Sequence, residues 1–114
     1  MQRGDIFIAT IAPRSGSEQS GTRPVLIISH DGFNHTSNWN SIIIIPLTTA
    51  LQPLKRAPTI VHLSQNYGVQ KDSMILCHQI TTIDKSKLGN KIGTITQEKM
   101  IDVEKAIQYA LGIM

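Results

Sequence analysis

Residues 41–47, Ser41-Ile42-Ile43-Ile44-Ile45-Pro46-Leu47, contain the strongest indication of the fold. The four consecutive isoleucines are β-branched and favour a strand, but they do not alternate with polar residues as they would in a half-exposed strand. A strand of this kind is covered on both faces, as in a small closed barrel or in one with a helix packed outside. We therefore expect residues 41–47 to form a central strand.

Further β-prone segments surround this stretch, separated by clusters of Gly, Pro, Asn and Asp. They are residues 6–11, 23–29, 59–63 and 73–80. Five short strands in succession predict an antiparallel sheet or barrel. Residues 83–89 could form one or two helical turns, and residues 91–95 a further short strand.

The end of the chain has a helical pattern instead. Thr96 is the expected N-cap, and Gly112 is expected to stop the helix. Apolar residues recur between them at helical spacing, at Met100, Val103, Ile107, Ala110 and Leu111. At 114 residues the chain fits one domain, so the predicted fold is a single mainly β domain, residues 1–114, with an amphipathic C-terminal helix.

Composition narrows the classes of function. A formal charge of +3 favours a polyanionic partner, without the concentrated basic tail of a protein that coats DNA indiscriminately. The sequence has no signal-peptide pattern, and none of its apolar stretches approaches the roughly 20 residues needed to cross a bilayer. We therefore expect a soluble, cytoplasmic protein without a membrane partner.

The single cysteine, Cys77, lies in an apolar run and is interpreted as a small buried side chain. The four histidines lack metal-ligand spacing, so we expect no metal and no cofactor.

The first candidate site is the polar loop Gly16-Ser17-Glu18-Gln19-Ser20-Gly21-Thr22-Arg23-Pro24, which enters a buried strand. Backbone N–H groups beside glycines can approach an anion closely, and a guanidinium matches the oxygens of a phosphate. The loop therefore favours phosphate binding through Arg23. The alternative is that Arg23 is an ordinary surface cation on a hairpin connection.

Thr48 and His78 are the next candidates. Thr48 ends the isoleucine strand, where its hydroxyl could donate a hydrogen bond to a phosphoryl oxygen or could simply cap the strand. Strand alternation predicts that Met74, Leu76 and His78 share one face, so His78 is either a proton carrier or a structural histidine.

Aromatic residues are scarce, at 4% of the chain, and their positions do not predict the pair of aromatic side chains on which RNA-recognition domains stack bases. A sheet that binds RNA only by stacking its bases is therefore disfavoured. Trp39 could stack on a base or a partner, or could anchor its own loop.

Six motifs together point to a family. They are Arg3-Gly4-Asp5-Ile6, Gly16-Ser17-Glu18-Gln19, Gly21-Thr22-Arg23-Pro24-Val25-Leu26-Ile27-Ile28-Ser29, Pro46-Leu47-Thr48, Gln79-Ile80-Thr81-Thr82-Ile83-Asp84-Lys85 and Ala110-Leu111-Gly112. In order and spacing they resemble the MazF/PemK toxins over essentially the whole chain. The resemblance implies an SH3-like β-barrel with a C-terminal helix, working as a homodimer. It also implies a metal-independent, sequence-specific endoribonuclease (an mRNA interferase) that cuts single-stranded RNA, inhibits growth and is neutralised by the C-terminal segment of a cognate antitoxin.

The same resemblance places the family's catalytic arginine on Arg23 and its catalytic threonine on Thr48, with Glu18 and Gln19 in the adjoining loop. In such a reaction the RNA 2′-hydroxyl attacks the neighbouring phosphate and leaves a 2′,3′-cyclic phosphate and a 5′-hydroxyl. We expect Arg23 to clamp the phosphate and Thr48 to donate to a nonbridging oxygen. Arg23 could also serve the leaving group as general acid. Glu18 is a candidate base, because an arginine would need an exceptional environment for that role.

Two positions depart from the family pattern. His78 stands where an acidic residue is frequent, and Thr81 stands where an arginine is frequent. If His78 faces the scissile phosphate, it could act as an acid or base near neutral pH.

The remaining expected contacts with RNA are Ser17, Gln19, Thr49, Lys55, Arg56 and Gln79. Lys55 and Arg56 would attract the RNA backbone or the acidic segment of the antitoxin, although a solvated charge pair is the plainer explanation.

Two alternatives come from other classes of protein. The first is a non-enzymatic toxin that binds DNA gyrase, as the related CcdB toxins do, but a pure binder has no need of Arg23 and Thr48 together. The second is a catalytically silent module that binds nucleic acid or an antitoxin, in which His78 and Thr81 record lost chemistry.

Overall fold

The computed structural model describes residues 1–12, 16, 21–50 and 56–113, and it contains strands, short 3-10 helices and two α-helices. In chain order the elements are β1 (Asp5–Ile11), β2 (Gly21–Ile27), α1 (Asp31–Asn34), β3 (Ser41–Thr49), β4 (Ile60–Leu63), η1 (Gln65–Tyr67), β5 (Ser73–Leu76), η2 (Cys77–Gln79), β6 (Thr81–Asp84), η3 (Lys85–Lys87), β7 (Leu88–Thr94) and α2 (Gln97–Leu111). The expected mainly β fold with a C-terminal helix is confirmed. None of the helices in the described part of the chain has both the length and the apolarity needed to cross a bilayer.

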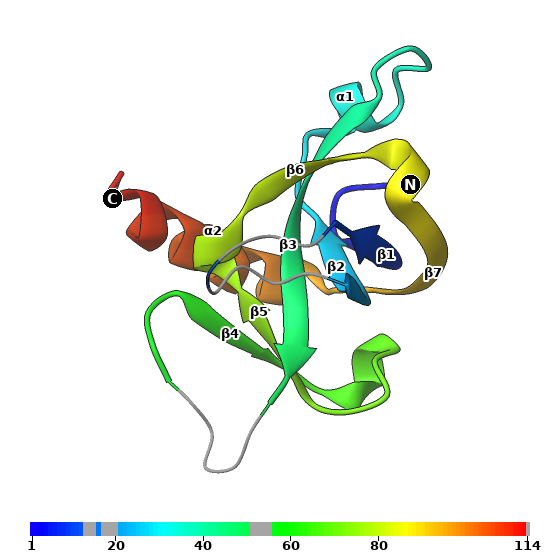
Figure 1. The fold of residues 1–114 in the computed structure, drawn as a ribbon. Coiled ribbons are helices and arrows are strands. Elements are labelled where there is room, and N and C mark those ends of the chain that lie inside the picture. The colour runs from blue at the N-terminus through cyan, green and yellow to red at the C-terminus, as the bar shows by residue number, and fades with distance from the viewer. Residues whose placement is uncertain (13–15, 17–20, 51–55, 114) are drawn as a thin grey trace.

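Strand β3 is the centre of the sheet, as predicted (Figure 1). The strands pair antiparallel in the order β4-β5-β3-β2-β1-β7, and β6 pairs with β3 as well. Along one edge β3 pairs with β2, and along the other it pairs first with β6 and then with β5. The isoleucine strand therefore holds three neighbours at once.

The core consists of two groups of buried side chains, and β3 supplies both. Ile42 and Ile44 belong to one group, whereas Ile45 and Leu47 belong to the other, together with Val103 of α2. Ile43 is an exception to the prediction that the whole run is covered, because it is 39% exposed. Helix α2 packs against η2 and β4, beside the second half of β3, so the covering layer reaches Ile45 but leaves Ile43 uncovered.

The predicted strand over residues 73–80 is too long. Strand β5 ends at Leu76, the chain makes the 3-10 turn η2, and β6 then continues along β3. Cys77 starts this turn, fully buried between β3, β4 and α2, and its N–H donates to the Thr59 carbonyl at 2.9 Å. Burial raises the pKa of the Cys77 thiol to about 12, in agreement with its interpretation as a small buried side chain.

The predictions for the rest of the chain are confirmed with altered boundaries. Only residues 85–87 of the segment 83–89 are helical, and the last strand runs from Leu88 to Thr94. The N–H of Lys99 donates to Thr96 Oγ1 at 3.1 Å, and Gly112 ends α2 with φ of 70°. Leu111 was expected on the buried face but is exposed, because the last turn of α2 extends beyond the sheet (Figure 1).

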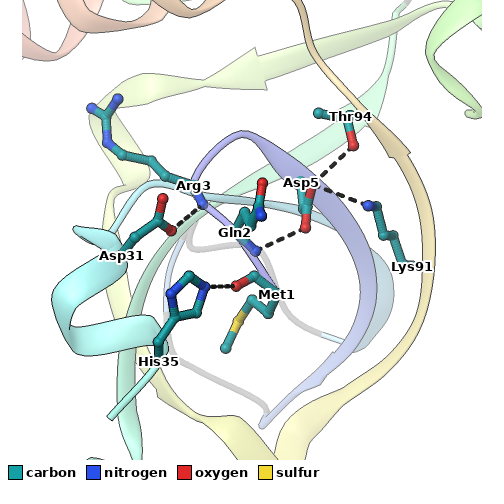
Figure 2. Close-up of polar contacts among 8 residues, drawn as sticks. All are labelled: Met1, Gln2, Arg3, Asp5, Asp31, His35, Lys91 and Thr94. Carbon is teal, nitrogen blue, oxygen red and sulfur yellow. Dashed lines mark hydrogen bonds and ion pairs between the residues drawn. The ribbon is translucent and has the colours of Figure 1, made fainter.

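The motif Arg3-Gly4-Asp5 has a structural role at the N-terminus (Figure 2). The buried Asp5 carboxylate accepts from the Gln2 N–H and from the Thr94 hydroxyl, both at 2.8 Å, and Lys91 Nζ lies 3.3 Å from it. The Arg3 N–H donates to Asp31 Oδ1 at 2.7 Å. These contacts tie the start of β1 to β7 and α1.

Asp31 is a second hydrogen-bonded carboxylate at this end of the molecule. Its Oδ1 accepts from Asn34 Nδ2 at 3.0 Å as well as from the Arg3 N–H. These two hydrogen bonds favour the carboxylate and hold the pKa of Asp31 below its ordinary value, Asn34 having the larger effect.

Candidate active site

A hollow of about 650 Å³ opens between β1, β2, β3, β7 and the turn that leads into β5. Its described lining consists of Ile8, Thr22, Arg23, Pro24, Leu47, Thr48, Thr49, Gly68, Val69, Gln70, Lys71, Ser73 and Ile92. We call this feature the Arg23 hollow. Both residues at the centre of the sequence prediction, Arg23 and Thr48, line it.

Strand register explains why Arg23 and Thr48 come together. The ladder between β2 and β3 runs from Ile27↔Ile44 to Val25↔Pro46. Arg23 stands two residues before Val25, and Thr48 stands two residues after Pro46, so both point to the same side of the sheet as the last pair. Arg23 Nη1 donates to the carbonyl of Leu47, the residue before Thr48, at 3.4 Å. The guanidinium is thereby held at the end of β3.

Two prolines mark the place where the hollow begins. Pro46 is in the last paired position of the β2–β3 ladder, and Pro24 follows Arg23. Neither has an N–H to donate to a neighbouring strand, so regular pairing of β2 with β3 stops there. The strands are then free to diverge, and the side chains beyond the ladder border open space.

The turn of residues 68–71 forms the opposing wall, and it was not predicted to belong to the site. Val69 is buried in the core, whereas Gln70 and Lys71 are exposed on the hollow. The Ser73 hydroxyl donates to the Lys71 carbonyl at 2.9 Å, and the Ala50 N–H donates to the Asp72 carbonyl at 2.9 Å. In the sequence, Gly68 and the polar residues after it precede a buried strand as the first loop does, but that pattern does not indicate that the turn lies against β7.

The other predicted site residues divide into three groups. Thr49 lines the hollow. His78 is exposed and Gln79 is half-buried on η2, Arg56 is exposed, and none of the three is among the lining residues. Ser17, Glu18, Gln19 and Lys55 lie outside the described residues.

The expected position of His78 requires a correction. Strand alternation does not apply to it, because the chain leaves the strand at Leu76 and His78 belongs to a 3-10 turn that packs against α2 and β4. The structure therefore does not bring His78 together with Arg23 and Thr48.

The described lining of the Arg23 hollow suits an anion. It contains two cationic side chains, Arg23 and Lys71, four hydroxyl groups and no Asp or Glu. The hydroxyls belong to Thr22, Thr48, Thr49 and Ser73. Cations and neutral donors without an opposing carboxylate favour a bound phosphate. Among the residues that the structure describes, no group of three or more His, Cys, Asp or Glu could hold a metal ion.

Comparison with known proteins identifies the family. The sequence of residues 2–111 matches the protein-family model described as "PemK-like, MazF-like toxin of type II toxin-antitoxin system". The chain is 39% identical over 114 residues to "Endoribonuclease MazF" of Staphylococcus epidermidis, an alignment covering 99% of this chain and 92% of that protein. It is 40% identical over 115 residues to "Endoribonuclease EndoA" of Bacillus subtilis, covering 100% and 97% of the two chains.

Solved structures agree with this result. MazF from Deinococcus radiodurans superposes with a TM-score of 0.81 at 21% identity, covering 98% of this chain and 96% of that one. An endoribonuclease from a mycobacterial species, solved in complex with its cognate antitoxin, superposes with a TM-score of 0.77 at 25% identity, covering 100% and 97%. The chain therefore belongs to the PemK-like, MazF-like toxin family of type II toxin-antitoxin systems.

Proposed function

We propose that this chain is an endoribonuclease toxin that cleaves single-stranded RNA in the Arg23 hollow. The observation that carries the proposal is the hydrogen bond of 3.4 Å from Arg23 to the Leu47 carbonyl, which holds the guanidinium beside Thr48 on a surface suited to phosphate. The relatives named as endoribonucleases, at 39% and 40% identity over nearly the whole chain, support the same reaction.

The reaction needs a small number of groups. RNA supplies its own nucleophile, the 2′-hydroxyl, which attacks the neighbouring phosphorus while the bond from phosphorus to the 5′-oxygen breaks. The enzyme aligns the two oxygens, stabilises the negative charge on the nonbridging oxygens, takes one proton from the 2′-hydroxyl and gives one to the leaving 5′-oxygen. Arg23 offers a positive charge and N–H donors to the phosphate, and Thr48 offers one hydroxyl donor to a nonbridging oxygen.

Glu18 is the proposed proton acceptor, and it lies outside the described residues. We prefer it to His78, since η2 does not border the hollow. Of the proposed RNA contacts, Thr49 has direct support from its place on the hollow. The others, Ser17, Gln19, Lys55, Arg56 and Gln79, remain predictions from the family pattern.

The assembly is also part of the proposal. A single domain over residues 1–114, an SH3-like closed barrel, a homodimer in the cytoplasm and inhibition by a cognate antitoxin follow from the family pattern. The relative solved with its cognate antitoxin supports the inhibition. Exposed apolar side chains on and after α2, at Ile101, Tyr109, Leu111 and Ile113, support contact with another protein surface.

The test is cleavage of a synthetic single-stranded RNA in excess EDTA by the purified chain. Loss of one donor to the developing charge costs about 10²- to 10³-fold in rate, so Arg23→Ala and Thr48→Val should each lose at least that factor in kcat/KM. Thr82→Val makes the same change at an exposed position of β6 and should cut like the wild type. Undiminished cleavage by a folded Arg23→Ala would overturn the site. Growth arrest with intact transcripts would instead favour a CcdB-like binder or a silent module.

A further inference from the structure

The turn of residues 68–71 places a second cation on the Arg23 hollow, opposite the pair that the proposed reaction uses. Lys71 is exposed on this turn and lines the hollow. Its ammonium makes no hydrogen bond or ion pair with the described residues, whereas the ammonium of Lys91 pairs with Asp5, that of Lys99 bonds the His62 carbonyl and that of Lys85 bonds three carbonyls. Lys71 therefore has a charge available to a ligand.

The backbone that carries Lys71 is fixed independently of any ligand. A Cβ built on Gly68 would lie 1.9 Å from the Ile92 carbonyl oxygen, so the start of the turn lies directly against β7. Val69 is buried in the core, and the Lys71 carbonyl accepts from the Ser73 hydroxyl at 2.9 Å. Binding through Lys71 then has to order its side chain but not its backbone.

The two cations of the hollow differ in kind. A guanidinium presents a planar fork that fixes the orientation of one phosphate, whereas an ammonium on a flexible stem acts as a point charge. We infer that Lys71 binds the RNA backbone at a phosphate next to the scissile one, and so contributes to affinity more than to the chemical step. This inference rests on the proposed function for the identity of the ligand.

The experiment measures binding separately from cleavage. The probe is a fluorescent single-stranded RNA with one 2′-deoxy nucleotide at the cleavage position, titrated with the protein at several salt concentrations. A cation that neutralises one phosphate of a single strand contributes about 0.7 to the slope of log K against log salt. We expect Lys71→Gln to weaken binding about tenfold at low salt and to reduce the slope by about 0.7, while Lys71→Arg keeps both near the wild-type values.

The matched control is Lys87→Gln, which removes the same charge at an exposed position of η3 away from the hollow. It should leave the salt slope unchanged. With the cleavable RNA, Lys71→Gln should raise KM by the factor lost in binding and change kcat by less than about twofold.

Three results would overturn the inference: a wild-type salt slope for Lys71→Gln, an equal loss of slope for Lys87→Gln, or a loss confined to kcat. Because the binding probe is not cut, failure of this inference is distinguishable from failure of the proposed function, which the Arg23→Ala cleavage rate decides.

Discussion

Gly93 offers the sharpest test of how the fold builds the hollow. A Cβ built on Gly93 of β7 would lie 2.0 Å from the carbonyl oxygen of Tyr67 and 2.9 Å from its carbonyl carbon. Ordinary Cβ contacts are not shorter than 3.0 Å, so Gly93→Ala requires the two backbones to separate by about 1 Å. Both sides of the contact are backbone, and a rotamer change on the Tyr67 side cannot relieve it.

Forced separation of packed segments costs about 1–3 kcal/mol, and a rigid backbone pair should lie at the upper end of that range. We therefore expect Gly93→Ala to lower the free energy of unfolding by about 2–3 kcal/mol. For a chain of this length, each kcal/mol lowers Tm by about 4 °C. Since Tyr67 leads into the turn of residues 68–71, RNA affinity should fall as well, because Gln70 and Lys71 move with the turn.

The matched control is Gly89→Ala on the same strand, where the nearest atom to an added Cβ is the Ile8 carbonyl oxygen at 3.3 Å. The assay is urea unfolding followed by circular dichroism, with the slope m compared between variants. If Gly93→Ala has a free energy of unfolding within about 0.5 kcal/mol of the wild type, or if the two glycine variants lose equal stability, the Gly93–Tyr67 contact is not the cause.

Two further predictions concern the supports of the fold. Asp31 has its pKa lowered from 3.8 by hydrogen bonds from Asn34 and Arg3, so its contribution to stability is present above about pH 4 and is lost as the pH falls through the lowered value. Urea unfolding from pH 7 to pH 2.5 should show Asp31→Asn less stable than the wild type at neutral pH and the difference shrinking in acid; a difference that grows in acid would contradict this sign. Thr96→Ala removes the hydroxyl that accepts the Lys99 N–H at 3.1 Å and should cost about 1 kcal/mol, whereas Thr96→Ser should retain most of it; equal losses in thermal unfolding would argue against the cap.

Local patterns predicted much of the fold because their physical causes are local. The β-branched run at residues 42–45 favours a strand through its own side chains, and the hydroxyl of Thr96 caps α2 within one turn of helix. What the patterns did not predict depends on contacts distant in the sequence. Ile43 is exposed because α2 does not cover that part of β3. The predicted strand 73–80 is interrupted at Cys77 because its two halves, β5 and β6, pair with different parts of the same edge of β3.

The candidate site shows the same division. Residue chemistry selected Arg23 and Thr48 separately, and the family resemblance joined them, but only the β2–β3 register explains why they meet. Lys71 was missed because nothing near it in the sequence indicates that Gly68 lies against β7. Strand alternation predicted that His78 shares a face with Met74 and Leu76, but His78 lies in a 3-10 turn, where side chains do not alternate between two faces.

The chemical ends of the cleavage products show whether Arg23 and Thr48 assist attack by the RNA's own 2′-hydroxyl, as we propose. Mass spectrometry of a cut oligonucleotide should show a 2′,3′-cyclic phosphate on one fragment and a 5′-hydroxyl on the other, and the same oligonucleotide with a 2′-deoxy nucleotide at the cleavage position should stay intact. Fragments with a 3′-hydroxyl and a 5′-phosphate, or cleavage of the 2′-deoxy oligonucleotide at an undiminished rate, would rule out attack by the 2′-hydroxyl.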